Sequence, residues 1–424
     1  MRGRRAAARS GPAPGTGVAA PLTGSATHGT SPDSPRRVYI HVPFCREKCD
    51  YCGFYSVAAK LPAADGVGVD RGRWVERREA FIAAAHAEWA AEAARQRVRR
   101  LETVYVGGGT PSLLGEEGLE RLLAPFFAGR SPRGTRLPLL TERAEVTVET
   151  NPEDVTPGYA AWAAARRVRV SLGVQSFDRR LRETLGRRAA ADPVAAFDRL
   201  RGAGVVNLGV DLIFGVPGQT SADVDRELAV VAALGPDHVS WYELDVEPGT
   251  RLAQRVGGDA VAADAAELYR RLVAGLERLG YGWYEVSNFA RPGRRSRHNL
   301  AYWRGRPYLG LGPSAVSTVG DLRWRNAADV ERYVRAWTDG APPRETERLD
   351  AATRARERLL LAARIGARVE LSELDPALDR AALQPLAGAG FISLQGGTLS
   401  LTRKGRYVAN EVCVRLFRDY FYGG

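Results

Sequence analysis

The 424-residue chain has only four cysteines, and three of them, Cys45, Cys49 and Cys52, share one short loop. So few cysteines exclude the dense disulfide framework of a small secreted domain. Long apolar runs are also missing. No stretch approaches the roughly 20 residues of a membrane-spanning helix, and the N-terminus lacks a continuous apolar segment of the secretory kind. We therefore expect a soluble, cytoplasmic protein whose reduced thiols are available to a metal.

Lysine is almost absent, so the net charge of +12 is carried by arginine. The arginines are spread along the chain rather than gathered beside stacking aromatics, which argues against a nucleic-acid partner. Acidic residues are missing before Asp33, and Pro, Gly, Ala, Ser and Arg dominate residues 1–35. This composition is compatible with an organellar transit peptide, but we predict a disordered extension.

From residue 37 onward, short β-rich runs alternate with helical patterns. The runs are VYIHVPF (38–44), TVYVGGG (103–109), EVTVETN (145–151), RVSLGVQSF (169–177), NLGVDLIFGV (207–216) and HVSWYELDV (238–246). Near-continuous apolar strands separated by helices indicate βαβ units and a parallel sheet. Six such units predict an α/β fold, a barrel or partial (β/α)6 TIM-like barrel, over residues 36–250. In barrels the functional residues lie at the C-terminal ends of the strands.

The pattern changes after residue 250. Residues 251–345 contain the aromatic stretch YGWYEVSNFARPG (281–293) and RHNLAYWRG (297–305), and we expect them to extend the core. Residues 346–424 predict a separate α+β domain. It has a helix in RARERLLLAARIG, a second helix near 376–389, a hairpin turned at Gly396 and Gly397, and a last helix in NEVCVRLFRDYF. This order resembles a winged-helix module, and Cys413, among apolar residues of the last helix, is expected in its core.

Polar residues and glycines fall where the predicted strands end. The cysteines follow the first strand, Gly107, Gly108 and Thr110 the second, while Glu149, Gln175 and Asp211 lie in or after the next three. Each has an ordinary structural explanation, because glycine makes turns and Asp caps helices. At the mouth of one barrel they would form a single site.

The cysteines are spaced C-x3-C-x2-C in HVPFCREKCDYCGFYS. Three thiolates at this spacing can ligate three irons of a 4Fe-4S cluster and leave the fourth iron open to a substrate or cofactor. The alternative is a zinc site, which needs His41 or another side chain as fourth ligand. A structural zinc site is not expected at the end of the first strand of a barrel, so we favour the cluster.

The chain resembles the radical S-adenosylmethionine (SAM) superfamily, and within it the group of oxygen-independent coproporphyrinogen III oxidases and HemW-like haem chaperones. The resemblance covers roughly residues 37–420. It lies in the motifs YIHVPFC, GGGTPS, ETNPE, SLGVQSF, DLIFGVPGQT, EPGT, YEVSNFARPG, RHNLAYWRG and YLGLGP. It implies that the three cysteines hold the cluster and that SAM occupies the open iron, where it is cleaved to a 5'-deoxyadenosyl radical.

The resemblance also implies a set of SAM contacts. Glycine backbone can approach a ligand closely, acidic and amide groups accept from ammonium and hydroxyl groups, and arginine pairs with carboxylate. For Arg187 the alternative is an isolated surface arginine. The matching residues are Tyr39, Gly107, Gly108, Thr110, Glu149, Gln175, Arg187 and Asp211.

Two functions stay open within this group. One is an oxidase that converts two propionates of coproporphyrinogen III to vinyl groups, forming protoporphyrinogen IX. The other is a chaperone that delivers haem to haem proteins such as respiratory enzymes. Oxidases carry a further cysteine two positions after the third, where this chain has Phe54. The chain therefore resembles the chaperone branch, and we predict the chaperone function, with SAM cleavage and enzymatic activity left open.

The segment HNLAYW (298–303) matches the H-N-x-x-Y-W motif of the chaperone branch, whose histidine is the candidate haem ligand. His298 is therefore our candidate, and the alternative is an ordinary hydrogen-bonded histidine at a domain seam. Chaperones usually read G-P-G-A-H-S after the G-L-G run, whereas this chain has Ser314 and Val316 at the glycine and histidine positions. Haem binding could therefore be altered or use another ligand. The expected partners are haem-accepting proteins and an electron donor, and a peripheral membrane contact stays open.

Overall fold

The computed structural model describes residues 34–59, 71–128, 139–189, 191–256, 264–340 and 344–417. The predicted N-terminal extension lies, as far as residue 33, outside these ranges. Within them, no helix is long and apolar enough to cross a membrane.

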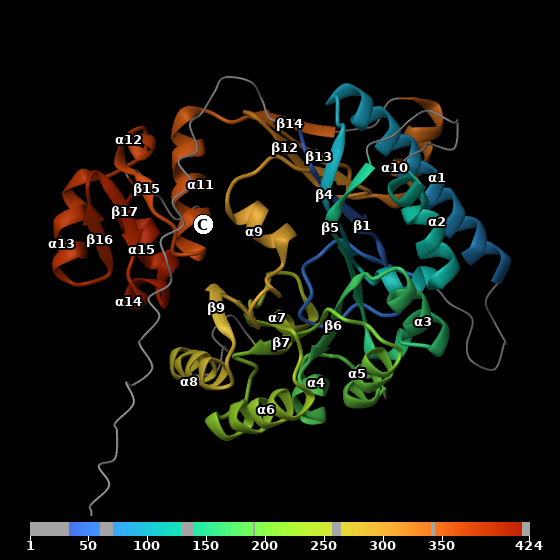
Figure 1. Cartoon of the computed structure of the whole chain (residues 1–424), viewed down its shortest axis with the longest axis horizontal. Coiled ribbons are helices and arrows are strands. Elements are labelled where there is room, and N and C mark those ends of the chain that lie inside the picture. Colours follow the sequence, from blue (N-terminus) through green and yellow to red (C-terminus); the bar gives the residue numbers. More distant parts are fainter. Residues whose placement is uncertain are drawn as a thin grey trace, which may run out of the picture. The chain divides into compact units, whose positions relative to one another are not determined.

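A nine-stranded sheet in the order β11-β1-β4-β5-β6-β7-β8-β10-β9 forms the centre of the fold (Figure 1). Its six middle strands run parallel, which confirms the predicted partial (β/α)6 barrel. They are β1 (Arg37–Val42), β4 (Arg100–Gly108), β5 (Leu139–Thr150), β6 (Arg169–Gln175), β7 (Leu208–Phe214) and β8 (His238–Glu243). The edges are β11 (Leu309–Leu311), parallel to β1, and the antiparallel pair β10 (Asn288–Ala290) and β9 (Gly282–Glu285).

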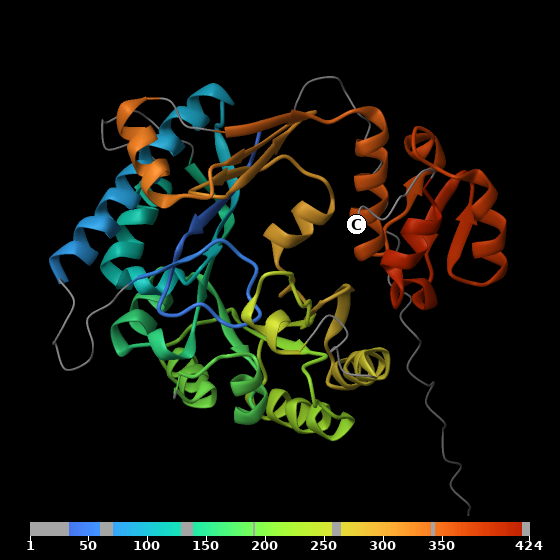
Figure 2. The ribbon, with the colours of Figure 1, turned by 180° about the vertical axis from the view of Figure 1, so that it is seen from behind.

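The main helices cover the outer side of this curved sheet (Figures 1 and 2). They are α1 (Arg71–Arg95), α2 (Gly115–Ala128), α3 (Pro157–Ala165), α5 (Pro193–Gly202), α6 (Ser221–Leu234) and α8 (Ala265–Arg278). Shorter elements at the strand ends are β2 (Phe44–Cys45), β3 (Val57–Ala58), η1 (Pro111–Leu114), η2 (Pro152–Asp154), α4 (Arg179–Thr184) and α7 (Arg251–Val256). Side-chain caps start several of these helices: Asp192 before Pro193, for example, accepts from the Val194 amide.

Each parallel strand has two different faces, because successive side chains point to opposite sides. On β1, Val38 and Ile40 are buried in the main core, which also contains Phe81 of α1 and Leu122 of α2. The alternate positions, such as Tyr39 on β1 and Ser171 on β6, face the inside of the barrel. The inner face is therefore polar, and the apolar core lies between the sheet and its helices.

A second sheet contains β12 (Val316–Val319), β13 (Leu322–Asn326) and β14 (Arg344–Arg348), and polar side chains of β13 and β14 contact α1. It is accompanied by α10 (Val330–Asp339), whereas α9 (Arg297–Trp303) lies on the inner side of the barrel (Figures 1 and 2).

The carboxylate of Glu88, on α1, joins this second sheet to the barrel. It is fully buried and accepts from the Gly312 amide at 2.8 Å, the Tyr333 hydroxyl at 2.6 Å and the Asn326 amide at 2.8 Å. The Arg344 guanidinium pairs with the same carboxylate at 3.1 Å. Removing one partner of a buried ion pair strongly destabilises the folded protein, because the other charge stays buried.

Residues 351–417 have a hydrophobic cluster of their own, which includes the buried thiol of Cys413 as expected. The elements follow the winged-helix order that the sequence indicates. They are α11 (Ala351–Arg364), β15 (Val369–Glu370), α12 (Leu371–Leu374), η3 (Arg380–Ala382), α13 (Leu383–Gly388), β16 (Ile392–Gln395), β17 (Thr398–Leu401), α14 (Arg403–Arg406) and α15 (Ala409–Arg415). The hairpin turns at Gly396 and Gly397, which have φ of 55° and 79°. The helix expected near 376–389 is instead a 3-10 turn followed by α13. The domain boundaries at residues 250 and 345 stay predictions.

We expect Glu88→Ala to lower the free energy of unfolding by about 3–5 kcal/mol, because three buried donors lose their acceptor and Arg344 keeps only one of its two carboxylate partners, Glu92 at 2.8 Å. Urea denaturation measures this change. The control is Glu267→Ala, which removes one member of an exposed pair with Arg270 and should cost less than about 1 kcal/mol. Equal losses in the two variants would contradict the role of Glu88.

Candidate functional site

A cavity of about 850 Å³ opens at the C-terminal ends of the parallel strands. The structure brings most of the sequence-predicted site residues together there. Those that line it are Cys45, Cys49, Cys52, Gly108, Thr110, Glu149, Gln175, Arg187 and Asp211. Tyr39, Gly107 and His298 lie behind this lining.

The cysteine loop is anchored to the barrel by Asp50. Its side chain is 2% exposed and pairs with Arg255 at 3.0 Å and more distantly with Arg188 and Arg251. Its backbone amide donates to the Leu185 carbonyl, and its own carbonyl accepts from the Leu252 amide. The loop is therefore held against the segments that follow β6 and β8.

Hydrogen bonds link two of the cysteines across the ends of neighbouring strands. The Thr110 hydroxyl donates to Cys45 Sγ at 3.7 Å, and the Asn151 amide donates to Thr110 Oγ1 at 3.1 Å. Arg187 in turn donates to Asn151 Oδ1 at 3.1 Å and lies beside Cys49. The Arg187 side chain is only 9% exposed. It is part of the pocket wall and not an isolated surface arginine.

The three thiols fit a cluster better than a single ion. Among the described residues, no three His, Cys, Asp or Glu side chains are close enough to hold one metal ion. A cluster does not need such convergence, because each thiolate binds a different iron. Both nitrogens of His41 are also engaged: Nδ1 with the Tyr39 hydroxyl at 3.0 Å and Nε2 with the Tyr55 carbonyl at 2.9 Å. This leaves no nitrogen for the zinc alternative.

Burial raises the pKa of the Cys49 thiol to about 11, despite the opposing effect of Arg187, and also raises that of Cys52. These thiols are protonated in the metal-free protein, so a metal must displace their protons when it binds.

Two carboxylates form the floor of the pocket. Glu149 accepts from the Tyr105 hydroxyl at 2.7 Å and from the Gly108 amide at 3.2 Å. Burial raises its pKa to about 7. Asp211 accepts from the Ser171 hydroxyl at 2.9 Å, and burial likewise raises its pKa.

Gly107 makes room for this floor. A Cβ there would lie 2.8 Å from Glu149 Oε2, which is closer than packed atoms allow. Tyr39 bonds to His41, and its ring lies 6.2 Å from that of Tyr105. Both residues therefore support the pocket from behind in this structure.

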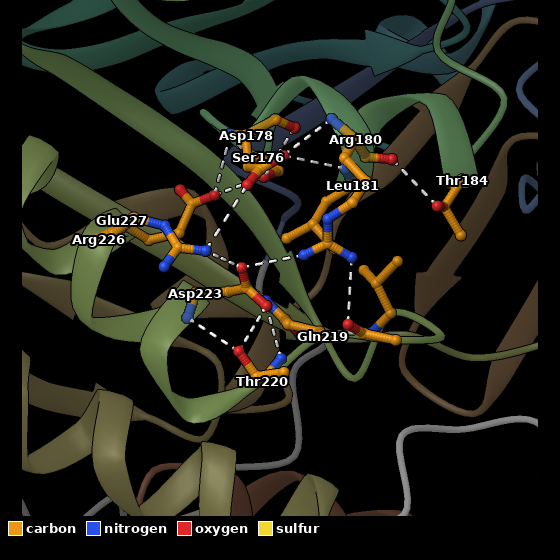
Figure 3. A network of polar contacts seen from close by, with 12 residues as sticks. Ser176, Asp178, Arg180, Leu181, Thr184, Gln219, Thr220, Asp223, Arg226 and Glu227 are labelled. Atoms are coloured by element: carbon orange, nitrogen blue, oxygen red, sulfur yellow. Dashed lines mark hydrogen bonds and ion pairs between the residues drawn. The ribbon is translucent and has the colours of Figure 1, made fainter.

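Gln175 has a left-handed backbone with φ of 67°, which costs a non-glycine residue about 1–3 kcal/mol. The residues after it are held by the carboxylate of Glu227, on α6 (Figure 3). This carboxylate is 3% exposed and accepts from the Phe177 amide at 3.0 Å, the Asp178 amide at 3.4 Å and the Ser176 hydroxyl. The hydrogen bonds offset the strain and keep Gln175 in the pocket wall.

The start of α6 is tied to α4 in the same network (Figure 3). Thr220 and Asp223 form a reciprocal capping box at the N-terminus of α6. Asp223 also accepts from Arg180 at 2.9 Å and from Arg226.

His298 is enclosed on the inner side of the barrel. It is 8% exposed, its Nδ1 shares a hydrogen bond of 2.8 Å with the Thr103 hydroxyl, and its ring lies 5.2 Å from that of Tyr105. Burial lowers its pKa to about 3, so the imidazole is neutral near pH 7. Tyr105 lines the pocket on its other side, so His298 is one aromatic ring away from it.

The structure also locates the residues at which this chain departs from the motifs of its group. Phe54 lines the pocket and is 70% exposed, so its ring is accessible from the cavity. Ser314 has φ of 64°, the left-handed conformation that suits the glycine of the usual chaperone motif. Val316 begins β12.

Comparison with known proteins identifies the family. The model of the radical SAM superfamily matches residues 39–230. The heme chaperone HemW of Mycobacterium tuberculosis (strain ATCC 25618 / H37Rv) is 38% identical over 395 residues, which cover 90% of this chain and 94% of that protein. This chain belongs to the HemW family of radical SAM proteins. The family implies a 4Fe-4S cluster and SAM.

A second HemW relative agrees with this assignment, and a solved structure shows the fold. The heme chaperone HemW of Bacillus subtilis (strain 168) is 29% identical and covers 89% of this chain and 98% of its own length. The solved structure of coproporphyrinogen III oxidase (HemN) from Escherichia coli, a radical SAM enzyme, superposes with a TM-score of 0.74. It is 22% identical and covers 91% of this chain and 90% of that one, which shows that the HemW-family chain has the same fold.

Sequence reasoning missed three residues of this HemW-family site. Asp50 lies inside the cysteine motif, and a single acidic residue there does not predict that it holds the cysteine loop through ion pairs. Glu227 reads as an ordinary charged residue of an amphipathic helix. Arg169 opens a predicted strand, and only its alternation with Ser171 could have placed it inside the barrel.

We expect Glu227→Ala to lower the free energy of unfolding by about 3 kcal/mol, because two backbone amides and a hydroxyl lose their buried acceptor. It should also weaken SAM binding, since Gln175 is no longer held. Urea denaturation and equilibrium dialysis measure the two effects. The control is Asp225→Ala on the same helix, an exposed partner of Arg271, for which we expect a change below about 1 kcal/mol. Unchanged stability of the Glu227 variant would show that Glu227 does not hold this turn.

Proposed function

We propose that this protein is a haem chaperone that keeps the radical SAM apparatus and delivers haem to haem proteins. The observation that carries the proposal is Phe54, an exposed aromatic ring beside Cys52 at the position where an oxidase has its additional cysteine. The names of the relatives from M. tuberculosis and B. subtilis support it.

In this proposal the three cysteine thiolates hold a 4Fe-4S cluster, which supplies a site for SAM and an electron for its cleavage. Arg187, between Cys49 and Asn151, can pair with a carboxylate. Glu149 and Asp211 on the floor can accept from ammonium and hydroxyl groups. Gly108 and Gly109 let the backbone approach the ligand. The cavity of about 850 Å³ is within the range of small-molecule sites.

His298 is our proposed haem-iron ligand. A neutral imidazole is the form that binds iron, and the bond of Nδ1 to Thr103 leaves Nε2 as the ligating nitrogen. Because the imidazole is enclosed, haem would have to displace part of α9 or its neighbours to reach it. Val316 stands where the usual chaperone motif has a histidine, so this position offers no imidazole to haem.

The proposed partners are haem-accepting proteins, such as respiratory enzymes, and an electron donor. We propose a cytoplasmic location.

We expect the anaerobically reconstituted protein to bind one 4Fe-4S cluster and haem, and to leave coproporphyrinogen III unchanged. Visible spectroscopy and iron analysis measure the cluster, and chromatography measures the tetrapyrroles. Cys49→Ala should lose the 4Fe-4S cluster. Cys413→Ala, which removes the buried thiol from the hydrophobic core of residues 351–417, should keep the 4Fe-4S cluster. Robust formation of protoporphyrinogen IX would instead assign the oxidase function.

We expect His298→Ala to weaken haem binding and to change the Soret band, because the iron loses its axial nitrogen. The matched control is His86→Ala, a histidine on the outer helix α1. Spectra and affinity that equal those of the wild type would exclude His298 as the ligand without affecting the assignment of the cluster.

A further inference from the structure

Arg169 lies inside the barrel, beneath the pocket. It is the first residue of β6 and is 3% exposed. Alternate residues of a strand share one face, so Arg169 points to the same side as Ser171, which lines the pocket. The guanidinium is therefore one side-chain layer below the pocket floor.

This guanidinium has no partner in contact with it within the described part of the chain. It forms no ion pair or hydrogen bond there, and its Nε is enclosed without an acceptor. Gly209 on the neighbouring strand leaves room for it, since a Cβ at that position would lie 3.4 Å from Arg169 Nη2. An unpaired buried cation is costly. The carboxyl group that favours its charge most is Glu145, followed by Asp211.

The two carboxylates of the pocket floor, in contrast, have hydrogen-bond donors but, in the residues that the structure describes, no cation in contact with them. Glu149 on β5 is bonded to a tyrosine hydroxyl and a backbone amide, and Asp211 on β7 to a serine hydroxyl. None of these donors is charged. The strands β5 and β7 flank β6 on its two sides. Arg169 is in register with Thr147 on β5, two residues before Glu149, and its guanidinium lies beside Gly209 on β7, two residues before Asp211. Both carboxylates therefore lie one side-chain layer beyond this cation, and among the described residues neither has a cation in contact.

We propose that Arg169 is a positioning residue that keeps Glu149 and Asp211 ionised, so that the pocket floor presents negative charge to SAM. This inference rests on the proposed SAM site. SAM carries a sulfonium, an ammonium and one carboxylate and is a net cation, whereas S-adenosylhomocysteine lacks the sulfonium and is neutral overall. The charge of the floor therefore favours SAM over this analogue.

The electrostatics of the floor agree with this role. Burial raises the pKa of both carboxyl groups, and Asp211 raises that of Glu149 further, while Arg169 lowers both. A neighbouring carboxylate disfavours ionisation and a nearby cation favours it, so the floor should be more protonated without Arg169.

Other polar groups inside the barrel face these three side chains from every neighbouring strand. The tyrosines, the serines and His238 among them are neutral near pH 7, and Glu145 is a third carboxyl group near Arg169. The groups are Tyr39, Tyr105, Tyr242, Ser171 and Ser240 around the carboxylates, and Glu145, His238 and Tyr284 around Arg169.

The pH dependence of SAM binding follows from this arrangement. SAM prefers the ionised floor, so in the wild type its affinity should fall as the pH drops below about 7, where Glu149 takes up a proton. In Arg169→Met the fall should begin at a higher pH. We expect SAM to bind this variant about tenfold more weakly at neutral pH and to regain most of the affinity by about pH 9.

Calorimetric titration of the anaerobically reconstituted protein with SAM and with S-adenosylhomocysteine tests this expectation. Arg169→Lys should keep the wild-type pH profile, because it keeps the charge. Arg166→Met, which removes an exposed arginine paired with Glu120, should also keep it. The loss in Arg169→Met should be smaller for S-adenosylhomocysteine. An equal loss at every pH, or an equal loss for both ligands, would make Arg169 a structural residue only.

Infrared titration of the ligand-free protein gives a test that does not depend on SAM. The band of the protonated carboxyl group that Glu149→Gln removes should disappear near pH 7 in the wild type. It should persist to higher pH in Arg169→Gln, a second neutral variant that serves if the methionine variant fails to fold. The same midpoint in both proteins would overturn the proposal. If the wild type bound no SAM, the proposed function would fail, and this titration would still decide the role of Arg169.

Discussion

The alternation of side chains along the six parallel strands is the constraint on which the rest of the structure depends. The apolar face of each strand packs against the outer helices, so the other face must point into the barrel. There it carries tyrosines, serines, carboxylates, histidines and an arginine instead of the apolar layers of a closed barrel. The open sheet edges at β11 and β9 and the inner helix α9 are consistent with an interior built to hold polar groups.

The fold was largely predictable because its signals are local. The six strands are short apolar runs separated by helical patterns, and the cysteine loop follows the first of them. The helix expected near 376–389 was wrong in detail, because Pro385 and the Asp379 cap divide that segment into a 3-10 turn and a short helix. The prediction of a hairpin at Gly396 and Gly397 was confirmed, because such a turn requires positive φ at both positions and glycine adopts it readily.

The site was only partly predictable, since much of it depends on contacts between distant residues. Position at a strand end correctly brought Glu149, Gln175 and Asp211 to one cavity. The same reasoning could not show that Tyr39 and Gly107 lie behind the lining, or that His298 is covered by Tyr105. Glu88 and Glu227 are helical glutamates whose partners lie far along the chain, so no local pattern separates them from solvent-exposed glutamates.

The anchoring of the cysteine loop by Asp50 has a thermodynamic consequence. Ion pairs to three arginines and backbone hydrogen bonds to two separate segments hold the loop without any help from a metal. The conformational entropy of ordering the loop is therefore lost when the chain folds and not when a cofactor arrives. A preorganised loop of this kind lets more of the binding free energy of the cofactor appear as affinity.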